Sequence, residues 1–349
     1  MKYGRKILRD VEGYVPGEQP QIPDIVKLNT NENPYPPSPK VIGALRSISP
    51  EALRRYPDPL STALRSAFAT CYGMPGLDWV ICGNGADELL ALAMRSFVDP
   101  GDTVLTTYPT YTLYETLALL HGAEIRMVHL DGRFGMPDAF FSTPARLCIV
   151  ARPNAPSGVA APRADIERLC QAFDGLVVID EAYADFADDN CLDFPQRFEN
   201  AIVMRTFSKS FSLAGLRLGV AFARPEIIAE FLKTKDSYNL NAIAQAVALA
   251  ALEDVDYAKT NVAKVRATRA RLTEALRTLG FDVPDSQANF VLARWDGTPD
   301  AKAVFAALRQ RAIIVRYFDA PRLSNALRIS VGTDHEVDRL LAALRDILG

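Results

Sequence analysis

The feature that most constrains the fold is an alternation of short apolar runs with longer segments of helical pattern, between about residues 56 and 223. Short apolar runs bounded by polar residues and turn residues indicate buried strands. Helical segments that separate such strands are typical of a mainly parallel sheet covered by helices on both faces. We therefore predict an α/β fold with a mainly parallel mixed sheet. The expected strands are Thr103–Thr106, Ile125–His129, Leu147–Val150, Leu176–Ile179, Ile202–Met204 and Leu218–Phe222, and the expected helices include Ala86–Val98, Leu113–Leu120 and Ala164–Phe173.

The rest of the chain predicts an arm and a second domain. Residues 1–40 are rich in Pro, Gly and Asn, which favours an arm over a domain with its own core. Residues 242–279 have a long helical pattern that would connect two domains. The tail contains expected strands at Phe290–Ala293, Ile313–Arg316 and Leu327–Val331 and expected helices at Ala301–Arg309 and His335–Leu348. We predict an N-terminal arm (1–40), a large domain (41–245) and a smaller C-terminal α/β domain (246–349).

The composition excludes several classes of function. A net charge of −3 gives no strongly basic surface for nucleic acid. The three histidines are far apart and the five cysteines form no CxxC pair, so no metal site is expected. No apolar run is long enough to cross a membrane, and none follows the basic residues near the start as it would in a signal peptide. We expect a cytoplasmic protein with reduced thiols and small-molecule ligands.

The segment Arg205–Arg217, RTFSKSFSLAGLR, places a lysine among hydroxyl side chains and near an arginine. The amine of Lys209 could form a Schiff base with an aldehyde, which is useful only where a fixed anion site holds the rest of the ligand. Thr206, Ser208 and Arg217 could supply that anion site. A lone Ser-Lys pair would more often lie in a solvated loop. The hypothesis therefore depends on residues elsewhere in the chain.

Further polar residues follow the expected strands, where ligands of α/β sheets collect. Gly83 and Gly85 permit a tight turn, and the free amides of Ala86 and Asp87 at the start of the next helix could bind a phosphate. Asp180 ends an apolar run and needs a cationic partner, such as a protonated pyridine nitrogen. Each position alone has an ordinary structural explanation. Two residues could hydrogen-bond a phenolic oxygen of the same ligand and a third could stack on its ring: Asn154, Tyr183 and Tyr111.

Together these segments resemble the fold-type I enzymes that use pyridoxal 5'-phosphate (PLP), and among them the histidinol-phosphate aminotransferases. The resemblance covers nearly the whole chain. It runs in order through EGYVPGEQP, LNTNENPYPPSP, RYPDP, GNGADELL, YPTY, RPNAPSG, VIDEAY, RTFSKSFSLAGLRLG, IIVRYF and LRISVGT. It implies a homodimer that transfers an amino group from histidinol phosphate to 2-oxoglutarate, a step of histidine biosynthesis.

The resemblance also implies a role for each residue of the PLP site. Lys209 would form the Schiff base with PLP, and Asp180 would pair with its pyridine nitrogen. Asn154 and Tyr183 would hold its phenolic oxygen, and Tyr111 would stack on its ring. The phosphate of PLP would be bound by Gly85, Ala86, Asp87, Thr206, Ser208 and Arg217, and by Tyr56 of the partner subunit. Catalysis would depend on Lys209, Asp180 and Tyr183.

Two arginines bear on the identity of the substrate. Arg316 interrupts an apolar run, and Arg328 lies in the alternating Leu327-Arg328-Ile329, so each is expected to face an anion. Arginines of an edge strand can also lie in water. The resemblance implies that Arg328 binds the phosphate of one substrate and a carboxylate of the other. Further substrate contacts would come from Arg316, Tyr14, Asn31 and Asn154.

The sequence leaves three alternatives and shows two departures from the family pattern. A decarboxylase of threonine phosphate would use the same lysine and aspartate, and an aromatic amino-acid aminotransferase is chemically close. A PLP-fold regulator would be favoured by an appended DNA-binding segment, which the sequence lacks. Ala86 stands where a serine is frequent, but keeps its backbone amide. Gly13 replaces the usual proline before Tyr14 and loosens the arm.

Overall fold

The structure, a computed structural model, describes residues 3–9, 11, 13, 17–20 and 23–349. Its largest element is a seven-stranded sheet in the order β2-β8-β7-β6-β5-β3-β4. Strand β8 runs antiparallel to both of its neighbours, and the other neighbouring pairs are parallel. This confirms the predicted mainly parallel mixed sheet. Its strands are β2 Val80–Gly83, β3 Thr103–Tyr108, β4 Glu124–His129, β5 Leu147–Ala151, β6 Leu176–Asp180, β7 Ala201–Thr206 and β8 Gly219–Phe222.

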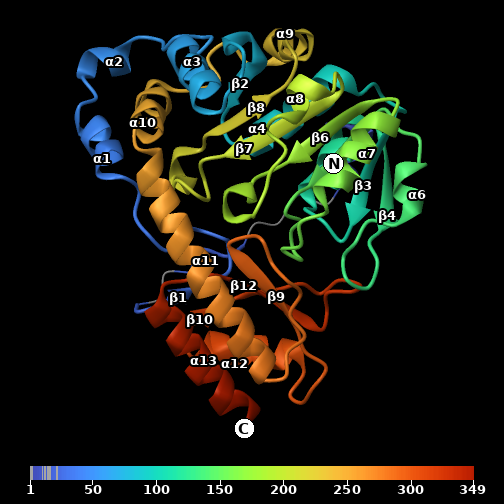
Figure 1. The fold of residues 1–349 in the computed structure, drawn as a ribbon, viewed down its shortest axis with the longest axis vertical. Helices are drawn as coiled ribbons and strands as arrows, with labels where there is room; N and C mark the ends of the chain where they lie inside the picture. Colours follow the sequence, from blue (N-terminus) through green and yellow to red (C-terminus); the bar gives the residue numbers. More distant parts are fainter. Residues whose placement is uncertain (1–2, 10, 12, 14–16, 21–22) are drawn as a thin grey trace.

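Helices cover both faces of this sheet because its central strands are apolar on both sides (Figure 1). Successive residues of a strand point to opposite faces, so Ile149 packs in one cluster and Cys148 and Val150 in another. One face is covered by α4 Ala86–Phe97, α5 Leu113–His121 and α9 Pro225–Thr234. The other face is covered by α3 Thr62–Cys71, α7 Arg163–Ala172, α8 Phe194–Arg197 and α10 Ala242–Leu252.

A second group of strands lies in the C-terminal part of the chain. Strands β11 Arg316–Tyr317, β12 Ala326–Ser330 and β9 Phe290–Arg294 form an antiparallel sheet in that order. Strand β10 Ile313–Ile314 instead pairs in parallel with β1 Val26–Lys27. The single predicted strand Ile313–Arg316 is therefore wrong: it is divided at the buried Val315 between two sheets.

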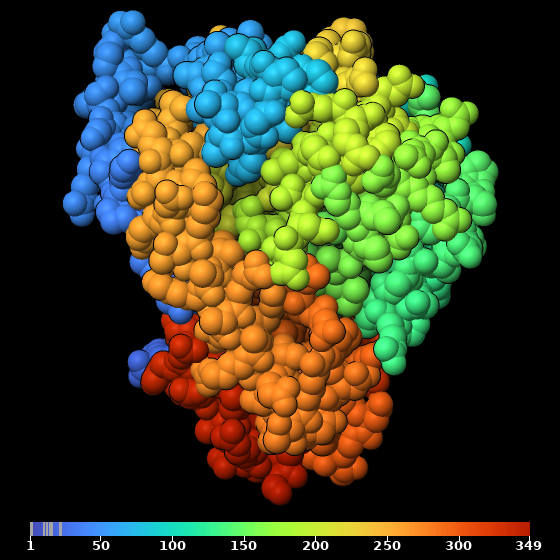
Figure 2. Space-filling view, in the orientation of Figure 1, coloured from blue at the N-terminus to red at the C-terminus, as the bar shows by residue number. Residues whose placement is uncertain are grey.

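The helix α11 Val255–Thr278 passes between the two regions (Figure 1). Ala258, near its start, packs in a cluster of the large sheet, whereas Val265, Leu272 and Leu276 pack in the core of the C-terminal region. That core also holds residues of α12 Ala301–Gln310 and α13 Asp334–Leu348. The predicted domain limits at residues 40 and 245 stay predictions. In Figure 2 the C-terminal region, in orange and red, forms the lower part of the molecule.

Short elements complete the described part of the chain. A 3-10 helix, η3 Ala184–Phe186, follows β6 and contacts α11. Several helices begin at side chains that accept hydrogen bonds from the first turn, including Ser38, Ser49 and Asn241. The described residues contain no helix that is both long and apolar enough to span a membrane. The other elements are η1 Lys6–Arg9, α1 Pro39–Arg46, α2 Pro50–Arg54, η2 Leu77–Trp79, α6 Asp138–Phe141 and η4 Ala214–Leu216.

Candidate active site

A cavity of about 670 Å³ lies at the carboxyl ends of the parallel strands, between the large sheet and the C-terminal region. Its volume is in the range of small-molecule and cofactor sites. Strand ends β6 and β7, the start of α4, residues 30–32 and strands β11 and β12 all contribute to its wall. The predicted site residues that line it are Asn31, Ala86, Asp87, Tyr111, Asp180, Tyr183, Thr206, Ser208, Lys209, Arg217, Arg316 and Arg328.

Lys209 lies three residues after the end of β7, with its amine inside the cavity. Its Nζ donates a hydrogen bond to the carbonyl oxygen of Thr30 (3.3 Å) and lies 5.6 Å from the centroid of the Tyr183 ring. The amide of Asn33 holds the turn by donating to the carbonyl oxygen of Lys209 (3.1 Å). Burial, and secondly the charge of Arg328, lower the pKa of Lys209 to about 8. About one tenth of the amine is therefore neutral and nucleophilic at pH 7, far more than at the ordinary lysine pKa.

Asp180 is the last residue of β6 and its side chain is buried. The hydroxyl of Tyr114 donates to Oδ2 (2.6 Å) and the amide of Ala182 to Oδ1 (3.1 Å). Burial raises the pKa of Asp180 despite these two hydrogen bonds, and the nearby Asp87 and Glu181 raise it further. A cationic ligand group beside this carboxylate would stabilise its ionised form.

Tyr114 was not predicted from the sequence. It lies on α5 with Leu117 and Ala118 on the buried face of the helix, where the spacing is that of ordinary core residues. The sequence signal that could have identified Tyr114 is a hydroxyl group on an otherwise apolar helix face. A buried tyrosine hydroxyl needs a hydrogen-bonding partner, so such a residue indicates a polar group nearby. Here that partner is Asp180.

An anion site can form where α4 begins. The helix starts at Ala86 after Gly85, so its first backbone amides and the positive end of its dipole are directed toward the cavity. Arg217 Nη2 donates to Asp87 Oδ2 (2.9 Å) at the same place. Gly85 has a φ of 90°, and a Cβ there would lie 2.5 Å from Arg217 Nη2. The positive φ favours glycine at this turn, and the guanidinium group of Arg217 occupies the space that a Cβ would fill.

Two hydroxyl groups extend this site. The hydroxyl of Thr206, the last residue of β7, donates to Ser208 Oγ (3.0 Å), and the backbone amide of Ser208 donates to Thr206 Oγ1 (3.2 Å). Both side chains are buried and both line the cavity. The structure therefore brings Thr206, Ser208 and Arg217 into one cavity with Lys209, as the sequence predicted.

The opposite wall joins the segment before residue 40 to the C-terminal strands. Asn31 Nδ2 donates to the hydroxyl of Tyr183 (2.9 Å), and the backbone amide of Asn31 donates to Ser330 Oγ in β12 (2.8 Å). Arg328 Nη2 donates to the carbonyl oxygen of Asn29 (2.8 Å). Both predicted arginines therefore reach the cavity, and Arg328 also ties two distant segments together.

The predicted residues Asn154 and Tyr56 do not line the cavity, and a third is not described. Asn154 lies between the lining residues Pro153 and Ala155, but its side-chain amide donates to Ser157 Oγ (3.1 Å) in its own loop and to Pro109 O (3.0 Å) in the loop after β3. Tyr56 is 80% exposed and, within the described chain, is not among the residues that line the cavity. Tyr14 lies outside the described residues.

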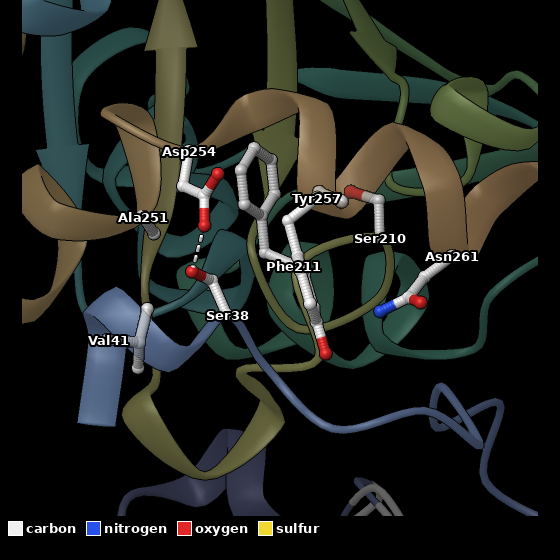
Figure 3. A pocket seen from close by; sticks show the side chains of 9 residues that line it. Ser38, Val41, Ser210, Phe211, Ala251, Asp254, Tyr257 and Asn261 are labelled. Atoms are coloured by element: carbon white, nitrogen blue, oxygen red, sulfur yellow. Dashed lines mark hydrogen bonds between the residues drawn. The ribbon is translucent and has the colours of Figure 1, made fainter. Parts of the chain in front are cut away.

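A second, much smaller cavity lies behind the Lys209 turn (Figure 3). Its volume of about 10 Å³ has room for about one water molecule and none for a substrate. Figure 3 shows Ser38 donating to the Asp254 carboxylate at one side of this cavity and Ser210 and Asn261 at the other. Among the described residues no group of three or more His, Cys, Asp or Glu side chains could hold a metal ion. The chemistry therefore belongs to the larger cavity.

Comparisons with known proteins identify the family of this chain. Residues 23–344 match the family model described as aminotransferase class I and II. The chain is 47% identical over 345 residues to a protein of Microcystis aeruginosa named histidinol-phosphate aminotransferase, covering 99% of this chain and 98% of that protein. A protein of Rhodopirellula baltica with the same name is 45% identical over 342 residues, covering 97% and 93%.

Solved structures show the same fold. The histidinol-phosphate aminotransferase of Sinorhizobium meliloti, in complex with pyridoxal 5'-phosphate, superposes with a TM-score of 0.84 at 29% identity, covering 92% of this chain and 90% of that one. The enzyme of that name from Clostridium acetobutylicum has a TM-score of 0.85 at 22% identity, covering 92% and 98%. These likenesses confirm the fold-type I architecture. The chain therefore belongs to the class I and II aminotransferase family.

Proposed function

We propose that the protein is a PLP-dependent aminotransferase that transfers an amino group from histidinol phosphate to 2-oxoglutarate, giving imidazole acetol phosphate and glutamate in histidine biosynthesis. Relatives with that name, at up to 47% identity over nearly the whole chain, support the choice of substrate. The single observation that carries the cofactor is the presence of Lys209, Asp180 and the anion site before α4 in one cavity.

The groups that line the cavity fit the polar parts of PLP. The amine of Lys209 suits its aldehyde, and the buried carboxylate of Asp180 suits a protonated ring nitrogen. The amides at the start of α4 suit its phosphate, with Thr206, Ser208 and Arg217 beside them. We assign the phenolic oxygen to Tyr183 and ring stacking to Tyr111. The contact of Asn154 with this oxygen stays a prediction, because its amide groups face Pro109 and Ser157.

When bound, PLP supplies an aldehyde that takes up the amino group and a ring that accepts the electrons of the broken C–H bond. Lys209 would be the residue that holds this cofactor covalently. Its Nζ, with a lowered pKa, would be the group that moves the proton of the substrate α-carbon. Asp180 would keep the ring nitrogen protonated, and the hydroxyl of Tyr114 holds the Asp180 carboxylate in place.

The two arginines would bind the distal anion of each substrate. Arg316 and Arg328 occupy directly opposite positions on β11 and β12 and line the wall facing Asp180 and Lys209. Bidentate guanidinium groups match both a phosphate and the second carboxylate of 2-oxoglutarate. Asn31 lies at the end of the cavity where the amino group of the substrate would react. Its side-chain amide donates a hydrogen bond to the Tyr183 hydroxyl there. The substrate contact of Tyr14 stays a prediction.

The test separates three reactions of the same cofactor. The PLP-loaded protein is mixed in turn with histidinol phosphate, threonine phosphate and phenylalanine, and both pyridoxamine phosphate and carbon dioxide are followed. We expect rapid formation of pyridoxamine phosphate with histidinol phosphate and no carbon dioxide. Release of carbon dioxide from threonine phosphate would instead identify a decarboxylase. A faster reaction with phenylalanine than with histidinol phosphate would identify an aromatic aminotransferase.

We also propose that the protein is a homodimer. Exposed apolar side chains gather on and after α1 and α2, which lie at one edge of the molecule, coloured blue in Figure 2. Leu45, Leu53, Tyr56 and Leu60 are exposed there, and the Tyr56 ring stacks on Tyr238 (4.4 Å between centroids). Such a surface is typical of an interface. Sedimentation should give twice the mass of the chain, and Tyr56→Ala should weaken the retention of PLP if this residue reaches the partner's cofactor. The cytoplasmic location stays a prediction.

A further inference from the structure

The two arginines of the cavity are held side by side although their charges repel. Strands β11 and β12 are antiparallel, and Arg316 is the direct partner of Arg328 in their register. Like charges at directly opposed positions of neighbouring strands destabilise a sheet. Neighbouring groups that interact favourably with both guanidinium groups lower the cost of this repulsion.

Phe318 lies against both guanidinium groups. The Cζ atom of Arg316 is 5.3 Å from the centroid of the Phe318 ring, and the Cζ atom of Arg328 is 5.4 Å from it. Arg328 also lies 5.4 Å from the centroid of the fully buried Phe290. Arg328 is thus in contact with two aromatic rings, and one of these rings is shared with Arg316.

The ring of Phe318 is fixed from its other side. It packs against the apolar cluster that contains Leu130, Phe134, Leu292, Leu323 and Ala326, while it also lines the cavity. Phe318 directly follows the two-residue strand β11 and lines the cavity together with Arg316, whereas Tyr317 does not line it. Tyr317 instead stacks on Phe305 at 5.8 Å. Phe318 is therefore held in place by apolar packing on one side and contacts the two guanidinium groups on the other.

The negative face of an aromatic ring attracts a guanidinium group, and the attraction increases where water is excluded. A ring shared by two guanidinium groups lowers the cost of keeping them together and removes rotational freedom from both. Two adjacent cations match a phosphate monoester, which carries about −1.5 to −2 charges at neutral pH, better than they match an uncharged group. The aromatic contact thus favours substrates with a highly charged distal end.

We propose that Phe318 is a positioning residue that sets the preference for a phosphate-bearing donor by holding Arg316 and Arg328 together. The inference rests on the proposed function, because it assigns the distal anion of the donor to this arginine pair. Phe318 need not touch the reacting atoms to have this role. Its effect is expected on substrate affinity and on the choice between donors, rather than on the chemical step.

The test compares two donors that differ only in the phosphate, histidinol phosphate and histidinol, in the half-reaction of the PLP-loaded enzyme. Phe318→Leu removes the ring and keeps apolar volume. We expect the concentration of histidinol phosphate needed for half the maximal rate to rise about tenfold, which corresponds to the loss of a desolvated cation–π contact. The maximal rate and the reaction of histidinol should change less than about twofold. Phe318→Tyr keeps the ring and should stay close to the wild type.

Tyr317→Leu is the matched control, because it removes the neighbouring aromatic ring from the face that does not line the cavity. It should leave both donors unaffected. A spectroscopic readout separates positioning from general support of the fold: the guanidinium NMR signals of Arg316 and Arg328, assigned with R316K and R328K, should move in Phe318→Leu and not in Tyr317→Leu. If Phe318→Leu does not fold, Phe318→Met replaces it.

Equal losses with both donors, or unchanged affinity together with unmoved arginine signals, would overturn the role of Phe318. Failure of the wild-type enzyme to accept histidinol phosphate at all is a different result. It would contradict the proposed function, and the inference that rests on it, whatever the Phe318 variants do.

Discussion

The wall of the cavity that carries Lys209 and the wall that carries Arg328 are built differently. Asp180 and Thr206 are the last residues of β6 and β7, which pair directly with each other in the large sheet, and Lys209 follows soon after. The Arg328 wall is assembled from β11, β12 and residues 29–31, which lie at nearly opposite ends of the sequence. The Lys209 wall is formed at the carboxyl ends of central strands of one continuous sheet. The Arg328 wall is formed where segments that are distant in the sequence meet.

This difference matches the two tasks of an aminotransferase. The chemistry at the amino group is common to all of its substrates and needs fixed geometry, which strand ends within one buried sheet supply. Recognition of the distal group must accept two different substrates in alternation. A wall of short strands and a loop, joined by hydrogen bonds such as Arg328 to Asn29, suits that second task. Mutations in the first wall should therefore affect rate, and mutations in the second should affect affinity.

The largest effect is expected from Lys209→Ala. It removes both the covalent attachment of PLP and the group that moves the proton, so turnover should fall by about 10⁴-fold or more. The visible absorption of the protein-bound cofactor should change at the same time. Lys233→Ala, at an exposed lysine of α9, is the control. An unchanged spectrum in Lys209→Ala would rule out the assignment of this lysine.

The second largest effect is expected from Asp180→Ala. Turnover should fall on the order of 10³-fold, because the ring nitrogen of PLP would no longer be held in its protonated form. Ser208→Ala, in the same wall, removes one of several phosphate contacts worth about 1.5 to 3 kcal/mol each and should mainly weaken PLP binding. Steady-state rates at saturating PLP compare the two. Similar rate losses in both variants would contradict the roles assigned here.

Arg328→Met tests the other wall. We expect the KM values for histidinol phosphate and for 2-oxoglutarate to rise on the order of 100-fold, since each substrate loses a charge-assisted contact. Retention of PLP should be unchanged, because the cofactor is held by the opposite wall. A fall in kcat with unchanged KM would mean that the two walls are not functionally distinct.

The smallest predicted effect is on the pH dependence of the rate at which the protein takes up PLP. Only the neutral amine of Lys209 attacks an aldehyde, so the rate at which PLP-free protein takes up added PLP should rise with pH and level off above about pH 8, the lowered pKa. Arg328 contributes to that lowering from the opposite wall. In Arg328→Met the pKa of Lys209 should rise and the plateau should move to higher pH. Stopped-flow absorbance measures both, and identical profiles would exclude electrostatic coupling between the walls.

The cofactor wall could be predicted from the sequence because strand ends are visible as the ends of apolar runs. Asp180 is found in this way, whereas Thr206, Ser208 and Lys209 are found from their grouping in one segment that is rich in hydroxyl side chains. Tyr114 could not be found, since its helical spacing equals that of core residues. The division at Val315 was missed because Ile313, Ile314 and Val315 form one apolar run whatever sheet each residue joins. Likewise, no local pattern tells an antiparallel β8 from a parallel strand.

The second wall was predictable in its residues but not in its contacts. Arg316 and Arg328 stand out because charges interrupt apolar patterns, whereas their shared ring depends on the pairing of β11 with β12. The hydrogen bond from Arg328 to Asn29 joins positions that no local rule connects. Asn154 shows the same limit, because its partners Pro109 and Thr110 come from a different strand end.

The pairing of β1 with β10 determines the order in which the molecule can be completed on the ribosome. All seven strands of the large sheet lie between residues 80 and 222, so this sheet can form while the rest of the chain is still being made. Val26 must wait for Ile313, which follows the last strand of the large sheet by about 90 residues. A nascent chain therefore gains the wall that we assign to PLP well before the wall for substrate. Added PLP should accordingly protect growing chains from proteolysis before the C-terminal strands emerge.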